Sequence, residues 1–145
     1  MDEGKGGGDV SRSLDDLHPK VRERCKAFIL ACEAAGIDVI ITSTLRTMED
    51  QAALYAKGRT MPGAKVTNAP PGHSYHNYGL AFDFAPLKHG KIDWNDLDLF
   101  RRCGEIGETC GLEWAGRWKR FREMAHLQWT GGLSIQELID GKRPD

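Results

Sequence analysis

Long apolar stretches are missing from this chain. No segment approaches the roughly 20 consecutive apolar residues that a membrane-spanning helix needs, so we expect no insertion into a membrane. An excess of charge of one sign is missing too, because the 145 residues carry a formal net charge of -1. Proteins that bind nucleic acid usually present a strongly basic surface. This balance therefore predicts no nucleic-acid partner.

A signal peptide is also missing. The first ten residues, MDEGKGGGDV, are acidic and rich in glycine, whereas a secretory signal contains an apolar segment of about 7–15 residues. We therefore expect a protein kept in the cytoplasm unless another process releases it. We interpret residues 1–10 as a flexible tail and residues 11–145 as one domain, which is long enough to bury a core without disulfide bonds.

Cysteines are few. Two pairs, Cys25 with Cys32 and Cys103 with Cys110, each have the spacing i, i+7 inside a predicted helix, which places both members of a pair on one helical face. This is not the short spacing of a structural zinc site. We expect buried free thiols, as is usual in a reducing compartment. A disulfide between the two helices and a site with four cysteine ligands are the alternatives.

Helices are predicted in four segments, where apolar residues recur at helical spacing beside start or stop signals. Proline suits a first helical turn, glycine commonly follows the last one, and Ser or Thr three residues before an acidic residue can cap the start. We predict one helix from Pro19 to Gly36, one from Thr47 to near Gly58, one over Asp96–Cys110, and a short one capped by Ser134 and Glu137.

Strands are predicted between these helices. Asp38–Ser43 is a run of β-branched residues, and Gly79–Ala85 alternates, with its phenylalanines on one face and Asp83 on the other. Trp114–Trp129 contains short strands and turns. Arg59–Gly72 shows no periodicity, and loops of this length are usually functional or disordered. We therefore predict an α+β fold in which helices pack on a small antiparallel sheet that carries the functional site.

A metal site is indicated by two segments. Asp83 has only alanines beside it on its face of the strand, and His76 comes just before that strand. Near the other end, His126 shares one face of a short strand with Gln128. Two imidazoles and one carboxylate match the ligands of a catalytic zinc ion, whose fourth position holds water. Glu123 could then accept the proton of that water.

Each of these residues also has an ordinary structural interpretation. A single histidine near a strand is usually structural, and Asp83 could cap a turn. Glu123 could be a solvated charge among Lys119, Arg120 and Arg122. Composition and spacing alone leave these alternatives open.

Longer motifs resemble one enzyme family. The pattern S-x-H-x₆-D, followed much later by E-x-x-H, is similar to zinc peptidases that include D-alanyl-D-alanine carboxypeptidases and dipeptidases and phage L-alanyl-D-glutamate endolysins. These share a fold with the hedgehog signalling domain, and the similarity extends from about Ser11 to Lys142. The motifs that carry it are Ser43-Thr-Leu-Arg46-Thr, Gln51-Ala-Ala-Leu-Tyr-Ala-Lys-Gly-Arg59-Thr, Val66-Thr-Asn-Ala, Ser74-Tyr-His76-Asn-Tyr-Gly-Leu-Ala-Phe-Asp83 and Gly111-Leu-Glu-Trp114.

The resemblance implies a role for each matching position. By position, zinc would be bound by His76, Asp83 and His126, the catalytic carboxylate would be Glu123, the active-site arginine Arg46, and the motif serine Ser74. One departure is that Ala125 and Leu127 flank the last ligand, where the family usually has proline and phenylalanine. We expect this difference to tune metal binding and not to abolish it.

Several side chains keep two interpretations. The guanidinium of Arg46 suits a substrate carboxylate or a developing oxyanion, or else a structural ion pair. Ser74 could orient a ligand or the substrate, or simply shape its loop. Trp114 and Trp118 could form the wall of a cleft or pack in the core, and His73 is not expected to bind the metal.

The function implied by the resemblance is that of a zinc endopeptidase that cuts the peptidoglycan stem peptide at L-alanyl-D-glutamate, as an endolysin acting on the cell wall after release. We expect a monomer whose partner is the peptidoglycan peptide. A D-alanyl-D-alanine carboxypeptidase with the same zinc site is the first alternative. An inactive, metal-bound module that binds the wall is the second, and Glu123 argues against it because binding alone needs no base.

Overall fold

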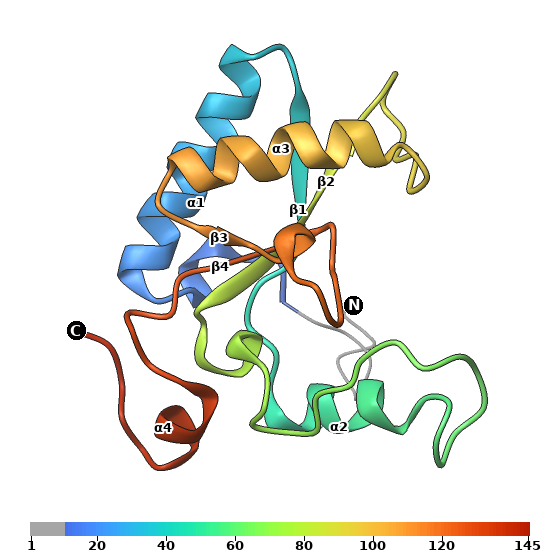
Figure 1. Cartoon of the computed structure of the whole chain (residues 1–145), viewed down its shortest axis with the longest axis vertical. Helices are drawn as coiled ribbons and strands as arrows, with labels where there is room; N and C mark the ends of the chain where they lie inside the picture. The colour runs from blue at the N-terminus through green and yellow to red at the C-terminus, as the bar shows by residue number, and fades with distance from the viewer. Residues whose placement is uncertain (1–10) are drawn as a thin grey trace.

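The structure is a computed structural model that describes residues 11–145 (Figure 1). The tail predicted for residues 1–10 lies outside the described residues. Among those described, no helix is long and apolar enough to cross a membrane. The elements in chain order are η1 (Leu14–Asp16), α1 (Pro19–Ala34), β1 (Asp38–Ser43), α2 (Met48–Ala56), η2 (Tyr75–Tyr78), β2 (Ala81–Leu87), α3 (Leu97–Thr109), β3 (Glu113–Trp114), η3 (Ala115–Arg117), β4 (His126–Gln128) and α4 (Ile135–Ile139).

One sheet of four strands, in the order β1-β2-β4-β3, connects these elements. Each of its pairings is antiparallel, and β2 lies between β1 and β4. Asp83 of β2 is directly opposite His126 of β4, and directly opposite residues in a sheet have adjacent side chains. The predicted α+β fold with an antiparallel sheet is confirmed, and its register brings two of the predicted ligands together.

The core lies on the face of β2 that carries its phenylalanines. Phe28 of α1 contacts both Phe82 and Phe84, with ring centroids 5.8 and 5.2 Å apart, and Phe84 also contacts Phe100 of α3 at 5.8 Å. Figure 1 shows α1 and α3 together at one end of the view and α2 at the other. Because side chains alternate along a strand, Asp83 points away from the aromatic core.

Local signals for the helix starts are confirmed. Thr47 and Ser134 each form a capping box with the acidic residue three positions later, at the starts of α2 and α4. Strand β2 lies two residues later than the predicted Gly79–Ala85, because Gly79 ends the preceding turn η2 and the strand runs from Ala81 through Pro86 to Leu87. Proline has no backbone N–H to donate to a neighbouring strand. The pairing of β4 with β2 ends at Asp83, so Pro86 faces no partner strand on the β4 side and no hydrogen bond is lost there.

The predicted loop between α2 and η2 is anchored at both ends. The Arg59 guanidinium donates to the backbone carbonyl oxygens of Tyr55 and Thr67, and the Gln51 amide of α2 donates to that of Ala69. These side-chain donors satisfy backbone carbonyl groups that would otherwise be paired within a helix or a sheet. The loop can therefore hold a defined position beside the sheet.

The cysteines lie on the buried faces of α1 and α3, in agreement with the predicted helical spacing. Cys25, Cys32 and Cys103 are fully buried in the core, and Cys110 at the end of α3 is partly exposed. Burial raises the pKa of Cys25 to about 12. All four are free thiols in the structure.

Candidate metal centre

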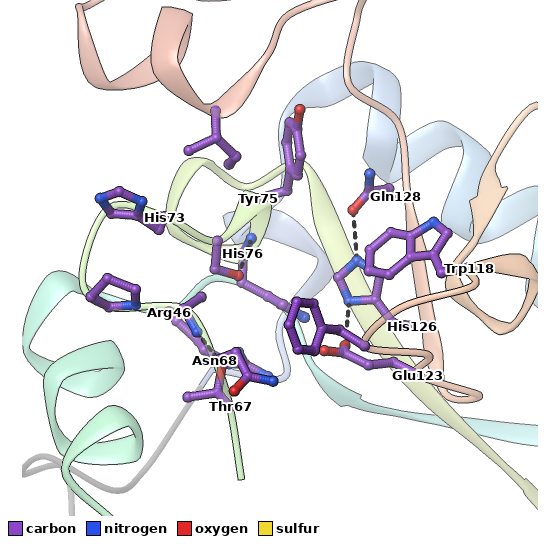
Figure 2. A pocket seen from close by; sticks show the side chains of 15 residues that line it. Arg46, Thr67, Asn68, His73, Tyr75, His76, Trp118, Glu123, His126 and Gln128 are labelled. Atoms are coloured by element: carbon purple, nitrogen blue, oxygen red, sulfur yellow. Dashed lines mark hydrogen bonds and ion pairs between the residues drawn. The ribbon is translucent and has the colours of Figure 1, made fainter. Parts of the chain in front are cut away.

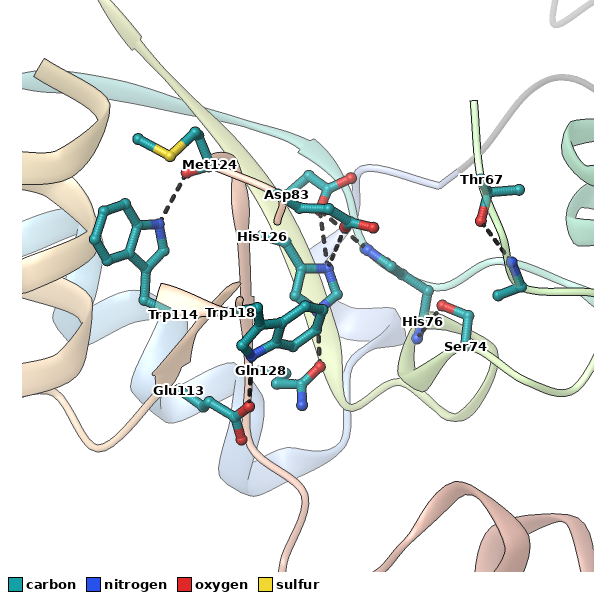
Figure 3. A network of polar contacts seen from close by, with 12 residues as sticks. Thr67, Ser74, His76, Asp83, Glu113, Trp114, Trp118, Met124, His126 and Gln128 are labelled. Carbon is teal, nitrogen blue, oxygen red and sulfur yellow. Dashed lines mark hydrogen bonds and ion pairs between the residues drawn. The ribbon is translucent and has the colours of Figure 1, made fainter. Parts of the chain in front are cut away.

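Three of the predicted site residues converge from three separate elements. His76 comes from η2, Asp83 from β2 and His126 from β4, and each offers one ligand atom within 4.8 Å of the others. Oδ1 of Asp83 lies 3.1 Å from Nε2 of His76 and 3.4 Å from Nδ1 of His126 (Figure 3). Tetrahedral zinc with bonds of about 2.0–2.1 Å would separate its ligand atoms by about 3.3 Å. The spacing therefore fits a metal ion held by these atoms.

The turn that carries His76 is fixed by its own sequence. The Ser74 hydroxyl accepts a hydrogen bond from the backbone N–H of His76 at 3.2 Å, and the Asn77 side chain accepts one from the backbone N–H of Ser74. The turn ends at Gly79, whose φ of 70° lies in the left-handed region that glycine adopts easily. Ser74 thus shapes the turn, and it also lines the cleft described below.

A second set of contacts orients the two imidazoles. Nδ1 of His76 lies 2.8 Å from the carbonyl oxygen of Thr44, which can only accept, so Nδ1 is protonated and donates. Nε2 of His126 lies 2.8 Å from Oε1 of Gln128 and donates to it in the same way. A metal-binding histidine usually donates its other N–H to such an acceptor. Both rings therefore turn an unprotonated nitrogen toward Asp83.

That arrangement is complementary to a cation. Two nitrogen lone pairs beside one carboxylate repel each other unless a proton or a metal ion lies between them, and Nδ1 of His126 is buried without a hydrogen-bond partner. Buried polar atoms are almost always satisfied. A metal ion bound by His76, Asp83 and His126 would satisfy all three at once.

The surroundings of the site favour the metal-binding protonation states of Asp83 and His76 but not that of His126. Burial acts to raise the pKa of Asp83, but the adjacent His76 and His126 outweigh it and lower that pKa well below its ordinary value. Burial lowers the pKa of His76. Burial also acts to lower the pKa of His126, but Asp83 and Glu123 outweigh it and raise that pKa. An ionised Asp83 and a neutral His76 are ready to bind metal, whereas a proton on His126 would compete with it.

Glu123 lies beside the three candidate ligands. Its Oε1 is 3.4 Å from Nδ1 of His126, and 51% of its side chain is exposed. A half-exposed carboxylate at this position can exchange protons with a water molecule in the site. This geometry brings Glu123 to the predicted place, next to the ligand set.

The two tryptophans have different positions. Trp118 lies over His126, with ring centroids 5.5 Å apart, and its indole N–H donates to Glu113. Trp114 is 3% exposed, and its indole N–H donates to the backbone carbonyl of Met124. Trp118 therefore forms part of the wall of the site, and Trp114 belongs to the core.

The site opens into a cleft of about 370 Å³. Figure 2 shows His73 on one side of the cleft and Trp118 on the opposite side, with Glu123 directly beside His126. His73 lines this cleft but is not among the clustered ligand atoms. A peptide chain could lie along the cleft with its backbone beside the metal site.

Arg46 forms the ion pair that the sequence left as an alternative. Its Nη2 lies 3.2 Å from Oδ2 of Asp83, and its Nη1 lies 3.4 Å from Oε1 of the fully buried Gln51. Because Gln51 also donates to the backbone carbonyl of Ala69, it connects Arg46 to the 59–72 loop. Arg46 also lines the cleft. It can therefore contact a molecule bound there while it forms this ion pair.

Some contacting residues had no predicted role. The sequence placed Gln128 on the face of His126 by strand alternation but gave it no function. Thr44 and Gln51 belong to motifs that carry the resemblance but were given no role, because their contacts with His76 and Ala69 join segments far apart in the chain.

Comparisons with known proteins agree with this arrangement. The pattern of the family described as VanY, D-alanyl-D-alanine carboxypeptidase, matches residues 14–130. The chain is 44% identical over 122 residues to the peptidoglycan L-alanyl-D-glutamate endopeptidase CwlK of Bacillus subtilis, which covers 78% of this chain and 73% of that protein. It is 31% identical over 109 residues to the L-alanyl-D-glutamate peptidase of Escherichia phage T5, which covers 75% of this chain and 73% of the relative.

Solved structures show the same fold. The Serratia marcescens L-Ala D-Glu endopeptidase ChiX aligns with a TM-score of 0.60 at 20% identity, covering 89% of this chain and 94% of that one. The vancomycin resistance D,D-pentapeptidase VanY, in complex with Zn(II), aligns with a TM-score of 0.59 at 18% identity, covering 93% of this chain and 91% of that one. The resemblance predicted from the motifs is confirmed, and the chain belongs to the VanY family of D-alanyl-D-alanine carboxypeptidases.

Proposed function

We propose that this protein is a zinc endopeptidase that hydrolyses the L-alanyl-D-glutamate bond of the peptidoglycan stem peptide. The observation that carries the chemistry is the pair of unprotonated imidazole nitrogens that face Asp83, with Glu123 beside them. The choice of bond is supported by relatives at 44% and 31% identity that are named for it.

In this proposal, His76, Asp83 and His126 hold the zinc ion. When bound there, zinc polarises the carbonyl of the scissile peptide and lowers the pKa of a water molecule toward about 7. Glu123 takes the proton of the attacking water at its Oε1 and passes it to the departing amide nitrogen. Its side chain is half exposed and its Oε1 lies 3.4 Å from Nδ1 of His126, so it reaches the space in front of the candidate ligands.

Arg46 and Ser74 support this step. Arg46 is held by Asp83 and Gln51 and lines the cleft, where its guanidinium can donate to a carbonyl or carboxylate of the substrate. Ser74 holds the backbone of His76 and thereby aims Nε2 at Asp83. Arg46 is proposed as a substrate-binding and catalytic residue, and Ser74 as a positioning residue beside the substrate.

The biological setting is part of the same proposal. The substrate is cell-wall peptidoglycan, and the likeness to a phage peptidase supports a role in host lysis. All the proposed site residues come from one chain, so a monomer suffices for activity.

A D-alanyl-D-alanine carboxypeptidase is the second candidate. The description of the family and the solved complex of VanYB with D-alanine-D-alanine favour it. The two candidates differ in the bond that is cut and therefore in the fragment released.

Digestion of purified peptidoglycan with the zinc-loaded protein, followed by mass spectrometry, tests both candidates. Cleavage at L-alanyl-D-glutamate leaves alanine on the glycan and releases peptides that begin with glutamate. A carboxypeptidase would release free alanine instead. Protein stripped of metal serves as the control, and the absence of any new fragment with the zinc-loaded protein would contradict both candidates.

A further inference from the structure

A second hollow continues the cleft beyond the metal site. It measures about 170 Å³ and shares four lining residues with the cleft, namely Thr67, Asn68, Phe121 and Glu123. Figure 2 shows Thr67, Asn68 and Glu123 at the same end of the cleft. The two hollows are therefore adjacent, and together we call them the groove; the proposed catalytic base, Glu123, lines both parts of it.

Two cations line only the outer part of this groove. Lys65 belongs to the loop after α2, and Arg122 belongs to the segment before β4, so they approach the hollow from separate segments. Both are exposed, and neither forms an ion pair with another residue of the described range 11–145. The groove thus has a positive outer end, and Glu123 is the acidic residue that lines it nearer the metal site.

Backbone contacts hold both cations in place. Nε of Arg122 donates to the carbonyl oxygen of Trp118 at 3.3 Å, which anchors the side chain and leaves its two terminal nitrogens available. The backbone of Lys65 packs closely on Gly58, where an added Cβ would lie 2.6 Å from the Lys65 nitrogen. The fold therefore fixes the course of the Arg122 side chain and the position of the Lys65 backbone.

Phe121 stands at the junction of the two hollows. Its side chain is 64% exposed, and its φ of 55° lies in the left-handed region, which is unusual for a bulky residue. Strained residues of this kind are concentrated at functional sites. Phe121 offers an apolar surface over which a peptide can pass from the metal site to the two cations.

The substrate of the proposed function brings an anion to this groove. The glutamate whose nitrogen forms the cleaved bond has two carboxyl groups, and a peptide that continues from it uses only one. A free carboxylate therefore lies on the leaving side of the scissile bond, and the C-terminal carboxylate of the peptide lies farther along. Arginine and lysine side chains bind carboxylates through charge-assisted hydrogen bonds.

We propose that Lys65 and Arg122 form a subsite that binds a free carboxylate of the stem peptide on the leaving side of the cleaved bond. The inference rests on the proposed endopeptidase function. It adds a determinant of specificity that lies outside the metal-binding residues, and it predicts a preference for peptides whose carboxylates are not amidated.

The test measures kcat/KM on three synthetic peptides that contain the L-alanyl-D-glutamate bond. One has all its carboxylates free, one has the spare glutamate carboxyl amidated, and one has the C-terminal carboxyl amidated. A charge-assisted hydrogen bond is worth roughly a tenfold change in binding. We expect the wild-type protein to prefer the free peptide by about that factor over one of the amidated peptides, which identifies the bound carboxylate.

Arg122→Gln and Lys65→Gln should each reduce this preference, and the double variant should abolish it, mainly through KM because binding is lost uniformly. The matched controls are Lys119→Gln and Arg120→Gln, exposed cations on the same segment that line neither hollow. They remove the same charge and should leave the preference intact.

The outcomes separate this proposal from the proposed function. If the wild-type protein cleaves none of the peptides, the endopeptidase function fails. If it cleaves all three equally, or if the control variants lose the preference as much as Arg122→Gln does, cleavage stands and the carboxylate subsite is wrong.

Discussion

Nε2 of His126 donates to Oε1 of Gln128 over 2.8 Å, and this contact turns Nδ1 of the same ring toward Asp83. Gln128 lies two residues after His126 in β4, on the same face of the strand, and is 3% exposed. A buried acceptor at this position fixes both the tautomer and the orientation of a candidate metal ligand.

Gln128→Met should therefore weaken zinc binding without unfolding the protein. Loss of such a contact typically lowers metal affinity by about 10–100-fold. The affinity is measured by competition with a chromogenic chelator. Gln136→Met, which changes an exposed glutamine of α4, is the matched control and should bind zinc like the wild type. Unchanged affinity in Gln128→Met would show that the contact does not orient His126.

His126→Ala should lose stoichiometric zinc, because two remaining ligands cannot hold the ion as three do. Metal content is measured on the purified protein after dialysis. His73→Ala is the control, since His73 lines the same cleft but is not among the clustered ligand atoms. Full zinc occupancy in His126→Ala would contradict the assignment of this ligand.

Glu123→Gln should keep the zinc and the fold but lose most of the turnover. A general base contributes about 10²–10⁴-fold, and its loss should fall on kcat more than on KM. Zinc content and peptidoglycan cleavage are measured on the same preparation. Loss of zinc would make Glu123 a ligand, and near wild-type cleavage would mean that another group activates the water. Glu33→Gln, at an exposed position of α1, is the control.

The thiols should react in two stages. Cys110 is partly exposed and the other three cysteines are fully buried, so one thiol should react quickly with a thiol reagent in the native protein and all four after unfolding. Cys110→Ser should remove the fast stage. Two or fewer reactive thiols in the unfolded protein would indicate a disulfide.

Alkaline pH should destabilise the fold partly through Cys25. Its pKa is raised from 9.0 to about 12 by burial, so the thiol stabilises the folded state fully below pH 9, and this contribution is lost as the pH rises toward 12. The free energy of unfolding falls by up to about 1.4 kcal/mol per pH unit for one such group. Denaturant unfolding gives this free energy for the wild type and for Cys25→Ala. Between pH 9 and pH 12 it should fall less steeply with pH in the variant than in the wild type, whatever the variant's absolute stability. Equal slopes in the two proteins would contradict this prediction.

The sequence by itself determined the features that depend on near neighbours in the chain. The capping boxes at Thr47 and Ser134 join residues three apart, and the alternation around Asp83 follows from the geometry of one strand. His76 and Asp83 are also close enough in the sequence for one motif to contain both candidate ligands. These signals were sufficient for the α+β fold class, whereas the full set of candidate ligands also needed the resemblance to a known family.

Only the tertiary structure decided how those ligands are supported. Asp83 and His126 become neighbours through strand pairing, and Arg46 reaches Asp83 and Gln51 from another segment. The position of Trp118 was also decided by the tertiary structure. The sequence left both the core and the wall of the site open for this residue, and the structure places it on the wall, against His126. Such contacts depend on register and packing between distant segments, which leave no periodic signal in the chain.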